Sequence, residues 1–331
     1  MTALPGRPVI DSPVQAVPVA VLDIETTGLH PGADRVVELS VVRVDPGEPA
    51  ELVLNTLINP ERRVAATEIH GITDDDVADA PRFGDVAGDL ARALAGCVLA
   101  AYNVYFDVRF LEDEFARVGF RQIPPHLCLM YLRPMLGLGK KCCLSDACRA
   151  HGIRHEEAHT AAFDALASAG LWRFYRQAMA EQGLQTFRDL TKLCAYKFVE
   201  SFVRSPLDQA AATSLPSLLR FKPRSHAGAD VSGAARATGE PRSRTAQLHE
   251  YWDALTAALA DLELSDSEIV DLQAKREQLG LRAEELRALH GRVFAAMLAE
   301  ALADSSISDD EWLRLRRLHE CLRQLGWAPG M

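Results

Sequence analysis

The sequence predicts an α/β fold, in which a mixed sheet is flanked by helices, followed by a C-terminal all-α domain. Three apolar, β-branched runs follow one another with short turns between them, at Val17–Ile24, Arg35–Val44 and Glu51–Ile58. Such a succession predicts an antiparallel meander. Helical and strand patterns then alternate up to about residue 182, and only helical patterns follow a Pro-, Gly-, Ser- and Arg-rich segment at 222–244.

The elements after the meander are predicted from hydrophobic spacing. Phe83–Ala95 has the spacing of a helix, and Cys97–Val104 returns to a strand pattern. Phe106–Gly119 is the next helix, because its apolar residues share one face and a glycine ends it. Two further helices are predicted at Leu144–His151 and at about Thr160–Gln182.

The chain is long for a single core, since compact domains stop growing at roughly 250–300 residues. Segment 222–244 has almost no large apolar side chains and cannot offset the entropy of ordering. We therefore expect five parts: a flexible tail at 1–16, an α/β domain at 17–182, a helical extension at 183–221, a basic flexible linker at 222–244 and a helical domain at 245–331.

The C-terminal domain contains two copies of one helix-start signal. Leu264–Glu268 and Ile307–Glu311 each place an S-x-x-E capping box after an apolar residue. The helices that follow end in Gln-Leu-Gly at Gln278–Gly280 and Gln324–Gly326. The simplest interpretation is a helical repeat of about 43 to 46 residues.

Charge and cysteine content narrow the class of protein. The net charge is −10, which argues against tight, extended binding to a nucleic-acid backbone, although residues 181–245 hold 10 basic and 6 acidic side chains. No run approaches the ~20 apolar residues of a membrane span, and residues 1–18 lack a signal-peptide pattern. Seven cysteines without a regular spacing favour a reducing cytoplasm over a disulfide framework.

Two carboxylates stand side by side where the first strand ends. Asp23 and Glu25 are two residues apart on a strand and therefore point to the same face. Two adjacent carboxylates repel each other, and a divalent cation with a preference for oxygen ligands removes that repulsion. Taken alone, the pair is also compatible with a strand that leaves the core for a polar turn.

Four motifs in order extend this observation. Asp23–Leu29 is DIETTGL, His70–Thr73 is HGIT, Asn103–Asp107 fits N-x-x-F-D and His159–Ala165 fits H-x-A-x-x-D-A. Together they resemble the motifs of the DEDDh (DnaQ-like) 3′→5′ exonuclease family, whose best-known bacterial member is the proofreading subunit of DNA polymerase III. The resemblance covers about residues 17–180, just over half of the chain.

The resemblance implies a ribonuclease-H-like fold and a two-metal site. By this resemblance, Asp23, Glu25, Asp107 and Asp164 hold two Mg²⁺ or Mn²⁺ ions, and His159 is the general base that takes a proton from the attacking water. At about 100° per residue, positions 159 and 164 of one helix would point roughly 140° apart. We therefore expect His159 to precede the helix that carries Asp164, and to be less ordered without substrate.

The same resemblance implies a set of residues that bind the terminal nucleotide: Thr26, Thr27, Gly28, Leu29, His70, Asn103 and Phe106. The two threonines and the glycine resemble the groups that hold the terminal sugar and its 3′-hydroxyl. The leucine and the phenylalanine are placed to pack on bases, although each fits a core position equally well. The histidine and the asparagine are expected to contact the nucleotide.

The expected activity is release of nucleoside 5′-monophosphates from the 3′ end of single-stranded DNA, in proofreading or repair. The motifs do not distinguish DNA from RNA, so an RNA-trimming or oligoribonuclease-like enzyme is the alternative within the same class. A non-catalytic adaptor of a replication or repair complex is the alternative from another class. The C-terminal domain is the expected site for a protein partner, and no membrane association is expected.

Other patterns were weighed against plainer explanations. Cys143, Cys148, His151 and His155 have spacings that resemble a zinc site, but they lie in a segment with helical periodicity where cysteine packs as a small apolar residue. Residues 300–311 resemble a calcium-binding loop, but without the required turn glycine. The C-terminal helices weakly resemble a TerB-like (tellurite resistance) domain, and a plain helical bundle explains them equally well.

Overall fold

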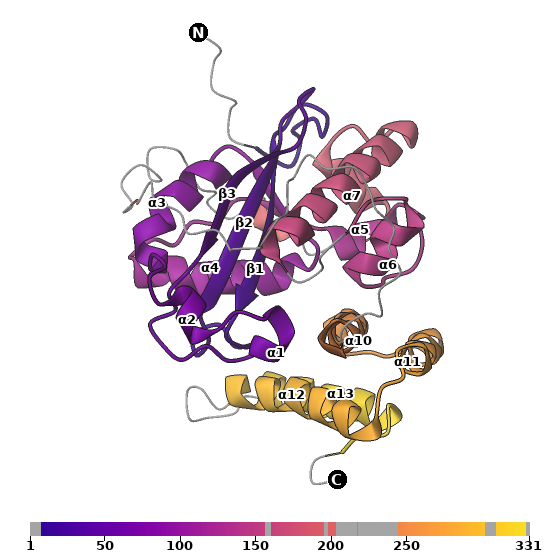
Figure 1. Cartoon of the computed structure of the whole chain (residues 1–331). Coiled ribbons are helices and arrows are strands. Elements are labelled where there is room, and N and C mark those ends of the chain that lie inside the picture. Colours follow the sequence, from indigo (N-terminus) through magenta and orange to yellow (C-terminus); the bar gives the residue numbers. More distant parts are fainter. Residues whose placement is uncertain are drawn as a thin grey trace.

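The computed structural model describes residues 8–155, 160–194, 198–202, 217, 244–301 and 309–328 (Figure 1). An α/β domain is followed by a group of helices that lies beneath one end of it in the view of Figure 1. None of the helices in the described ranges is long and apolar enough to cross a membrane.

A five-stranded mixed sheet forms the centre of the α/β domain. Its strands are β1 (Val19–Thr26), β2 (Val36–Val44), β3 (Glu51–Leu57), β4 (Val98–Ala101) and β5 (His126–Cys128). The order across the sheet is β3-β2-β1-β4-β5. The first three strands are antiparallel neighbours, whereas β4 runs parallel to β1 and β5 parallel to β4. The predicted meander and the ribonuclease-H-like mixed sheet are confirmed.

Strand β1 lies in the middle of the sheet, and its sequence reflects that position. Its first four residues, Val19 to Leu22, are fully buried and apolar, as expected for a strand covered on both faces. Polar side chains appear only towards the carboxyl end, beginning at Asp23. The strand therefore delivers its carboxylates to the edge of the core.

Helices flank the sheet (Figure 1): α1 (Thr67–His70), α2 (Asp74–Val77), α3 (Phe83–Leu94), α4 (Val104–Arg117), α5 (Leu129–Met135), α6 (Leu144–Ala150) and α7 (Ala161–Glu181). Helices α3 and α4 pack together through an edge-to-face contact of Phe83 and Phe115, with ring centroids 5.4 Å apart. Helix α7 packs on β1 and β2 and buries Trp172 and Tyr175. This packing fixes the first turn of α7 beside the carboxyl end of β1.

The sequence patterns do not predict β5 and α5, nor the one-turn helices α1 and α2. Strand β5 has only three residues, follows Pro124-Pro125, and is defined by its pairing with β4. Because so short a segment carries no period of its own, only the sheet neighbour specifies it. Helix α5 begins at the next residue and contains Pro134, which argues against a helix in the sequence alone.

The segments at the borders of the α/β domain are only partly described. Val14, within the segment expected to be a tail, is buried, and its amide donates a hydrogen bond to the Gln185 carbonyl. Two short helices, η1 (Phe187–Lys192) and α8 (Phe198–Ser201), lie within the expected helical extension. The predicted linker at 222–244 lies outside the described residues except for Arg244, and the five domain boundaries stay predictions.

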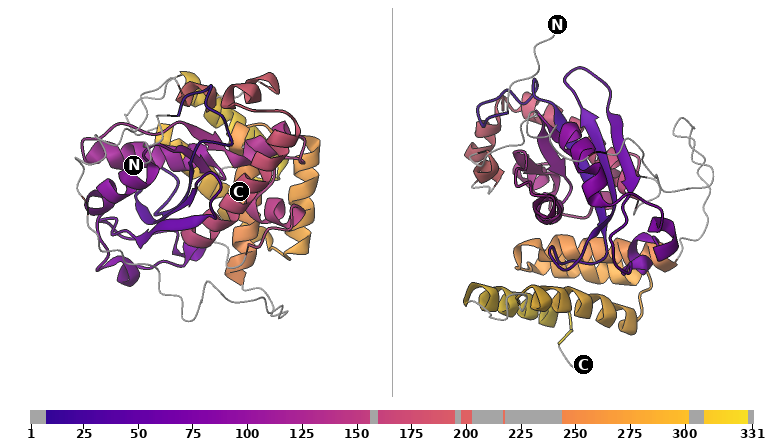
Figure 2. Two further views of the ribbon diagram at one scale, coloured as in Figure 1. Left: turned by 90° about the horizontal axis from the view of Figure 1, so that it is seen from above. Right: turned by 90° about the vertical axis from the view of Figure 1, so that its left-hand side faces the viewer.

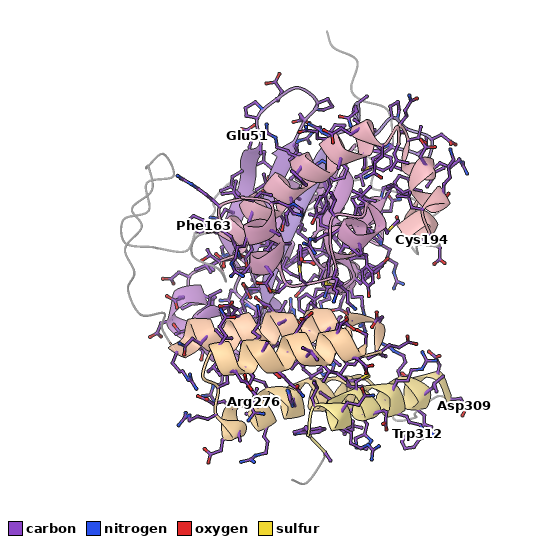
Figure 3. The ribbon with its side chains drawn as sticks, turned by 90° about the vertical axis from the view of Figure 1, so that its right-hand side faces the viewer. Glu51, Phe163, Cys194, Arg276, Asp309 and Trp312 are labelled. Atoms are coloured by element: carbon purple, nitrogen blue, oxygen red, sulfur yellow. The ribbon has the colours of Figure 1, made fainter. Side chains whose placement is uncertain are left out.

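The C-terminal helices, here called the helical module (residues 244–301 and 309–328), form two layers. They are α10 (Arg244–Ala258), η2 (Leu259–Asp261), α11 (Asp266–Gln278), α12 (Ala283–Ala301) and α13 (Asp309–Gln324). Figures 2 and 3 show α10 and α11 next to the α/β domain and α12 and α13 on the far side of them. The predicted all-α domain is confirmed.

The first predicted helix start is also present. The side chains of Ser265 and Glu268 form the capping box of α11. Of the second predicted start, Ile307 and Ser308 lie outside the described residues. The described part of that helix, α13, places Trp312 on its outer surface (Figure 3).

Candidate active site

Three carboxylates from two elements converge at the carboxyl end of β1. Asp23 and Glu25 come from β1, and Asp164 comes from the first turn of α7. One oxygen atom of each carboxylate lies within 4.8 Å of the others. This is the largest grouping of potential metal ligands among the described residues, and it unites three of the four predicted metal-binding carboxylates.

The fourth predicted carboxylate, Asp107, lies in the first turn of α4 and is buried. It lines a small cavity together with Asp23 and Asp164. Burial raises the pKa of Asp107 to about 8, although hydrogen bonds from its own amide and from the Ile24 backbone favour the charged form. The structure therefore brings all four predicted carboxylates to one place.

Burial and mutual repulsion make this cluster costly to ionise. The pKa of Asp23 is raised well above its usual range, first by burial and then by the charges of Asp164, Asp107 and Glu25. Among the described residues, no lysine or arginine lines the adjoining cavities, so the four carboxylates need a bound cation to be ionised together. An all-oxygen, anionic donor set matches the preference of Mg²⁺ and Mn²⁺, so the residues fit the expected divalent ion.

The turn that follows β1 is held by Asp34. Thr27 Oγ1 donates to Asp34 Oδ1 at 3.0 Å, and the His30 amide donates to Asp34 Oδ2 at 3.0 Å. The Thr26 hydroxyl donates to the Gly28 carbonyl at 2.6 Å. These bonds fix the segment that is predicted to hold the terminal sugar.

Position 28 requires a glycine because the Asp34 carboxylate lies very close to its Cα atom. A Cβ atom at this position would lie 2.3 Å from Asp34 Oδ2. We expect Gly28→Ala to displace Asp34 and to lower kcat/KM on an oligonucleotide by roughly 10–100-fold, because small displacements of positioning groups are costly in catalysis. The measurement is steady-state cleavage, with Gly291→Ala as control, since a Cβ at this helical glycine meets only ordinary contacts from 3.6 Å outwards. Equal kinetics for the two variants would contradict the assignment.

A buried ion pair anchors the other end of the turn. The Arg35 guanidinium donates to both carboxylate oxygens of Glu114, at 2.7 and 2.8 Å, and Glu114 is 1% exposed. Glu114 also accepts a bond from the Val36 amide. The pair thus ties the start of β2 to helix α4.

We expect Glu114→Ala to lower the free energy of unfolding by about 3 kcal/mol, because it leaves Arg35 largely buried without its partner. Asp113→Ala, one residue away, removes the exposed Arg117 pair and should cost less than about 1 kcal/mol. Urea denaturation of both variants tests the difference. Similar losses would show that the Arg35 pair does not anchor the turn.

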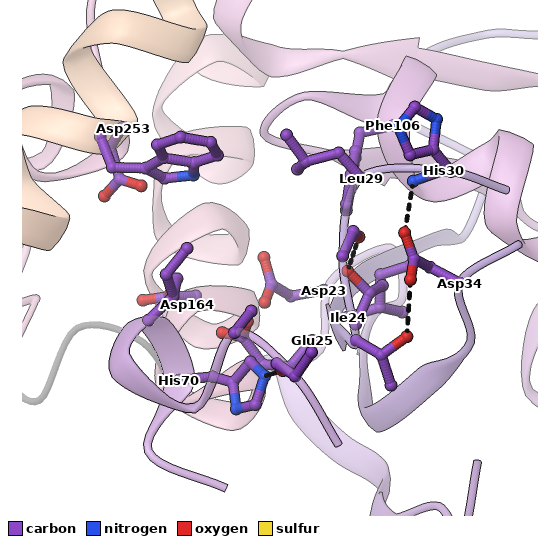
Figure 4. A pocket seen from close by; sticks show the side chains of 17 residues that line it. Asp23, Ile24, Glu25, Leu29, His30, Asp34, His70, Phe106, Asp164 and Asp253 are labelled. Atoms are coloured by element: carbon purple, nitrogen blue, oxygen red, sulfur yellow. Dashed lines mark hydrogen bonds between the residues drawn. The ribbon is translucent and has the colours of Figure 1, made fainter. Parts of the chain in front are cut away.

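The carboxylates open onto a cavity of about 430 Å³, within the size range of small-ligand sites (Figure 4). Six of the seven predicted substrate residues line it: Thr26, Thr27, Gly28, Leu29, His70 and Phe106. The seventh, Asn103, lines an adjoining cavity of about 190 Å³ with Phe106. Both ring nitrogens of His70 are engaged, with the Ala65 carbonyl at 3.1 Å and the Ile72 amide at 3.1 Å. These bonds hold its ring in the cavity wall.

The predicted general base, His159, lies outside the described residues. A different histidine contacts the cluster: His155 Nε2 lies 2.5 Å from Asp164 Oδ1, and its Nδ1 lies 3.1 Å from the Ser145 hydroxyl. The four residues with a zinc-like spacing do not come together as metal ligands in the described part of the chain: Cys143, Cys148, His151 and His155.

Three residues at the site are not predicted by the sequence motifs. Glu38 lies on β2 directly opposite Glu25, is fully buried, and accepts a bond from the Ala161 amide at 3.2 Å, which fixes the start of α7. A glutamate within the apolar run of β2 was the available signal. Trp252 and Asp253 of α10 line both cavities, and nothing in the local pattern of that helix marks them.

Fold and carboxylate cluster together define a nuclease-type α/β domain, and comparison with known proteins agrees. Residues 20–172 match the RNase T family, described as exonuclease. The family recognised from the four motifs is thereby confirmed. The resemblance of the C-terminal helices to a TerB-like domain has no support from these comparisons.

Curated relatives match the same half of the chain. A "DNA polymerase III subunit epsilon-like protein" of Rhodobacter capsulatus is 34% identical over 184 residues, which are 54% of this chain and 26% of the relative. A "DNA polymerase III PolC-type" of Bacillus subtilis is 32% identical over 177 residues, which are 52% of this chain and 12% of the relative. The chain therefore spans about a quarter or less of the length of these relatives.

Two solved structures are also similar. One is "Exonuclease X in complex with 5' overhanging duplex DNA", with 24% identity, a TM-score of 0.42, and coverage of 53% of this chain and 99% of that one. The other is "Crystal structure of E. coli Exonuclease I in complex with a dT13 oligonucleotide", with 19% identity, a TM-score of 0.43, and coverage of 50% and 42%.

Proposed function

We propose that the protein is a divalent-metal-dependent 3′→5′ exonuclease that releases nucleoside 5′-monophosphates from single-stranded DNA, in proofreading or repair. The observation that carries the proposal is the convergence of Asp23, Glu25, Asp107 and Asp164 beside a cavity of nucleotide size. The names of the polymerase III relatives support DNA as the substrate. The seven free cysteines fit a reducing compartment such as the cytoplasm.

The four carboxylates would hold two Mg²⁺ or Mn²⁺ ions, which when bound neutralise developing charge on the scissile phosphate and activate water. Of the chain's own groups, Thr26, Thr27 and the backbone at Gly28 are proposed to hold the terminal sugar. We assign His159, by its place in the third motif, to accept the proton of the attacking water.

The remaining positions are proposed to bind the terminal nucleotide. Leu29 and Phe106 line the cavity and offer apolar surfaces to its base, a mode of contact that tolerates any sequence. His70 and Asn103 lie at its walls. Apolar contacts of the kind made by Leu29 and Phe106 suit an enzyme that removes successive nucleotides of any sequence.

The test is degradation of 5′-labelled single-stranded DNA and RNA of identical sequence, with Mg²⁺ or Mn²⁺ or with EDTA. A ladder of shortened, label-retaining products that disappears with EDTA and in Asp164→Asn would support 3′→5′ hydrolysis. Immediate release of a labelled mononucleotide would instead show the opposite polarity. Faster cleavage of RNA would favour the RNA-trimming alternative. Intact strands beside a folded protein that also leaves a mononucleotide ester intact would favour the adaptor.

A further inference from the structure

Helix α10 lies across the carboxyl end of β1, where the candidate active site opens. Figure 1 and the right-hand view of Figure 2 both place α10 between the α/β domain and the outer helices. Trp252 and Asp253 line the same two cavities as Asp23 and Asp164. In Figure 4, Asp253 lies on the same side of the cavity as Asp164. Asp23 and Asp253, which are 230 positions apart in the sequence, thus line the same cavities.

The apolar contacts of α10 engage side chains that a nucleotide would need. Leu29 and Ile69 both line the cavity, and both pack against the hydrophobic cluster of the helical module. Trp252 belongs to that cluster and is 6% exposed. Ala257, also on α10, is buried in the core of the α/β domain instead. Leu29, one of the two side chains proposed to contact the base, is therefore already partly covered by the chain itself.

The chemistry of α10 is unsuited to holding a nucleic-acid strand here. It presents Asp253 to a space that already contains four carboxylates, and burial together with Asp164 raises the pKa of Asp253 to about 7. Among the described residues, neither cavity is lined by a lysine or an arginine. Binding of phosphates relies on such cations, so α10 has the character of a cover rather than of a binding surface.

Three ion pairs hold the rim of this contact, and each joins a lysine that is 11% exposed to a more exposed carboxylate. Lys141, which precedes α6, lies 3.0 Å from Asp261 and 3.5 Å from Glu268 of the module. Lys275 of α11 lies 2.7 Å from Asp146 of α6. Because each carboxylate stays partly exposed to solvent, which screens the charges, we expect each pair to contribute only modestly to the contact.

We propose that the helical module is an autoinhibitory cover: α10 closes the active site against polynucleotides in the resting protein and must move away before a 3′ end can enter. The inference rests on the proposed exonuclease function. A cavity of about 430 Å³ remains beneath α10, so a single nucleotide ester is small enough to enter the closed form.

The experiment compares a small and a large substrate on the full chain with Mn²⁺. The small substrate is the p-nitrophenyl ester of thymidine 5′-monophosphate, and the large one is a 5′-labelled 20-nucleotide DNA. Lys141→Glu places a carboxylate against Asp261 and Glu268 and should open the cover. Lys140→Glu makes the same charge change at the neighbouring exposed residue and serves as control. Lys141→Glu combined with Asp261→Lys restores one pair of opposite charges across the rim.

We expect Lys141→Glu to raise kcat/KM for the DNA roughly fivefold to tenfold, the effect of losing two weak ion pairs, and to leave ester hydrolysis unchanged. Lys140→Glu should behave as wild type, and the charge exchange should return the DNA rate towards wild type. Fluorescence anisotropy of the DNA with Ca²⁺ in place of Mn²⁺ should show tighter binding to Lys141→Glu alone.

One result would contradict the inhibitory cover, and a different result would contradict the exonuclease function. If Lys141→Glu cleaves and binds DNA as wild type does, or less well, the module is not an inhibitory cover. If neither ester nor DNA is cleaved by any variant, the proposed function fails, and the anisotropy measurement alone then decides whether α10 competes with nucleic acid.

Discussion

Replacing Asp23 by Asn is expected to abolish nuclease activity and, at the same time, to stabilise the metal-free protein. Asp23 is half-buried beside Asp164, Asp107 and Glu25, and its carboxylate is kept at the cost of desolvation and repulsion. An amide removes both costs but cannot serve as an anionic ligand. We expect kcat/KM to fall by roughly a thousandfold or more, while the thermal midpoint measured in EDTA rises.

The two effects must appear together, because sites that serve function often sacrifice stability. Asp113→Asn, at an exposed pair on α4, is the matched control and should change neither property appreciably. An Asp23→Asn variant that loses activity through unfolding would show a lower midpoint in EDTA. That result would contradict the assignment of Asp23 as a strained ligand.

The second large effect is a pH-dependent stability that metal reverses. Asp107 has a pKa raised to about 8 in the folded protein, above its value of about 4 in an unfolded chain. Its neutral form is thus favoured by the fold. The stability that it contributes is fully present below about pH 4 and is lost as the pH rises through about 8.

We therefore expect the thermal midpoint in EDTA to fall between pH 5 and pH 8 relative to Asp107→Asn, which has no proton to lose. Saturating Mg²⁺ or Mn²⁺ should remove the deficit, since a hundredfold excess over Kd contributes about 2.7 kcal/mol. The metal-induced rise should be larger at pH 8 than at pH 5, because ligands must be deprotonated. Parallel pH profiles for wild type and Asp107→Asn, with no metal response, would contradict this interpretation.

The sequence was sufficient for the parts of the fold that local patterns encode. The runs at β1, β2 and β3 and the helices α3, α4, α6 and α7 show their own periods, and four motifs located the carboxylates. The expectation that Asp164 lies inside the helix that follows position 159 also agrees with the structure, in which α7 begins at Ala161. The spacing of residues within one segment therefore predicts the site residues that the segment contributes.

What remained hidden depends on contacts between distant parts of the chain. Glu38 is one glutamate in an apolar strand until β2 pairs with β1 and brings it opposite Glu25. Helix α10 has the composition of an ordinary helix, and only its docking shows that Trp252 and Asp253 face the carboxylates. The spacing of His155 resembles that of a zinc ligand, yet in the structure its ring contacts Asp164. Tertiary placement decides each of these roles.

The central claim is that the carboxylate cluster binds the catalytic cation, and the most direct measurement is a Mn²⁺ titration followed by electron paramagnetic resonance. Wild type and Asp164→Asn would be titrated at pH 8 in the presence of thymidine 5′-monophosphate. The account predicts two bound ions per wild-type chain and the loss of at least one in the variant. Equal binding by the two proteins, or no binding to wild type, would contradict the account.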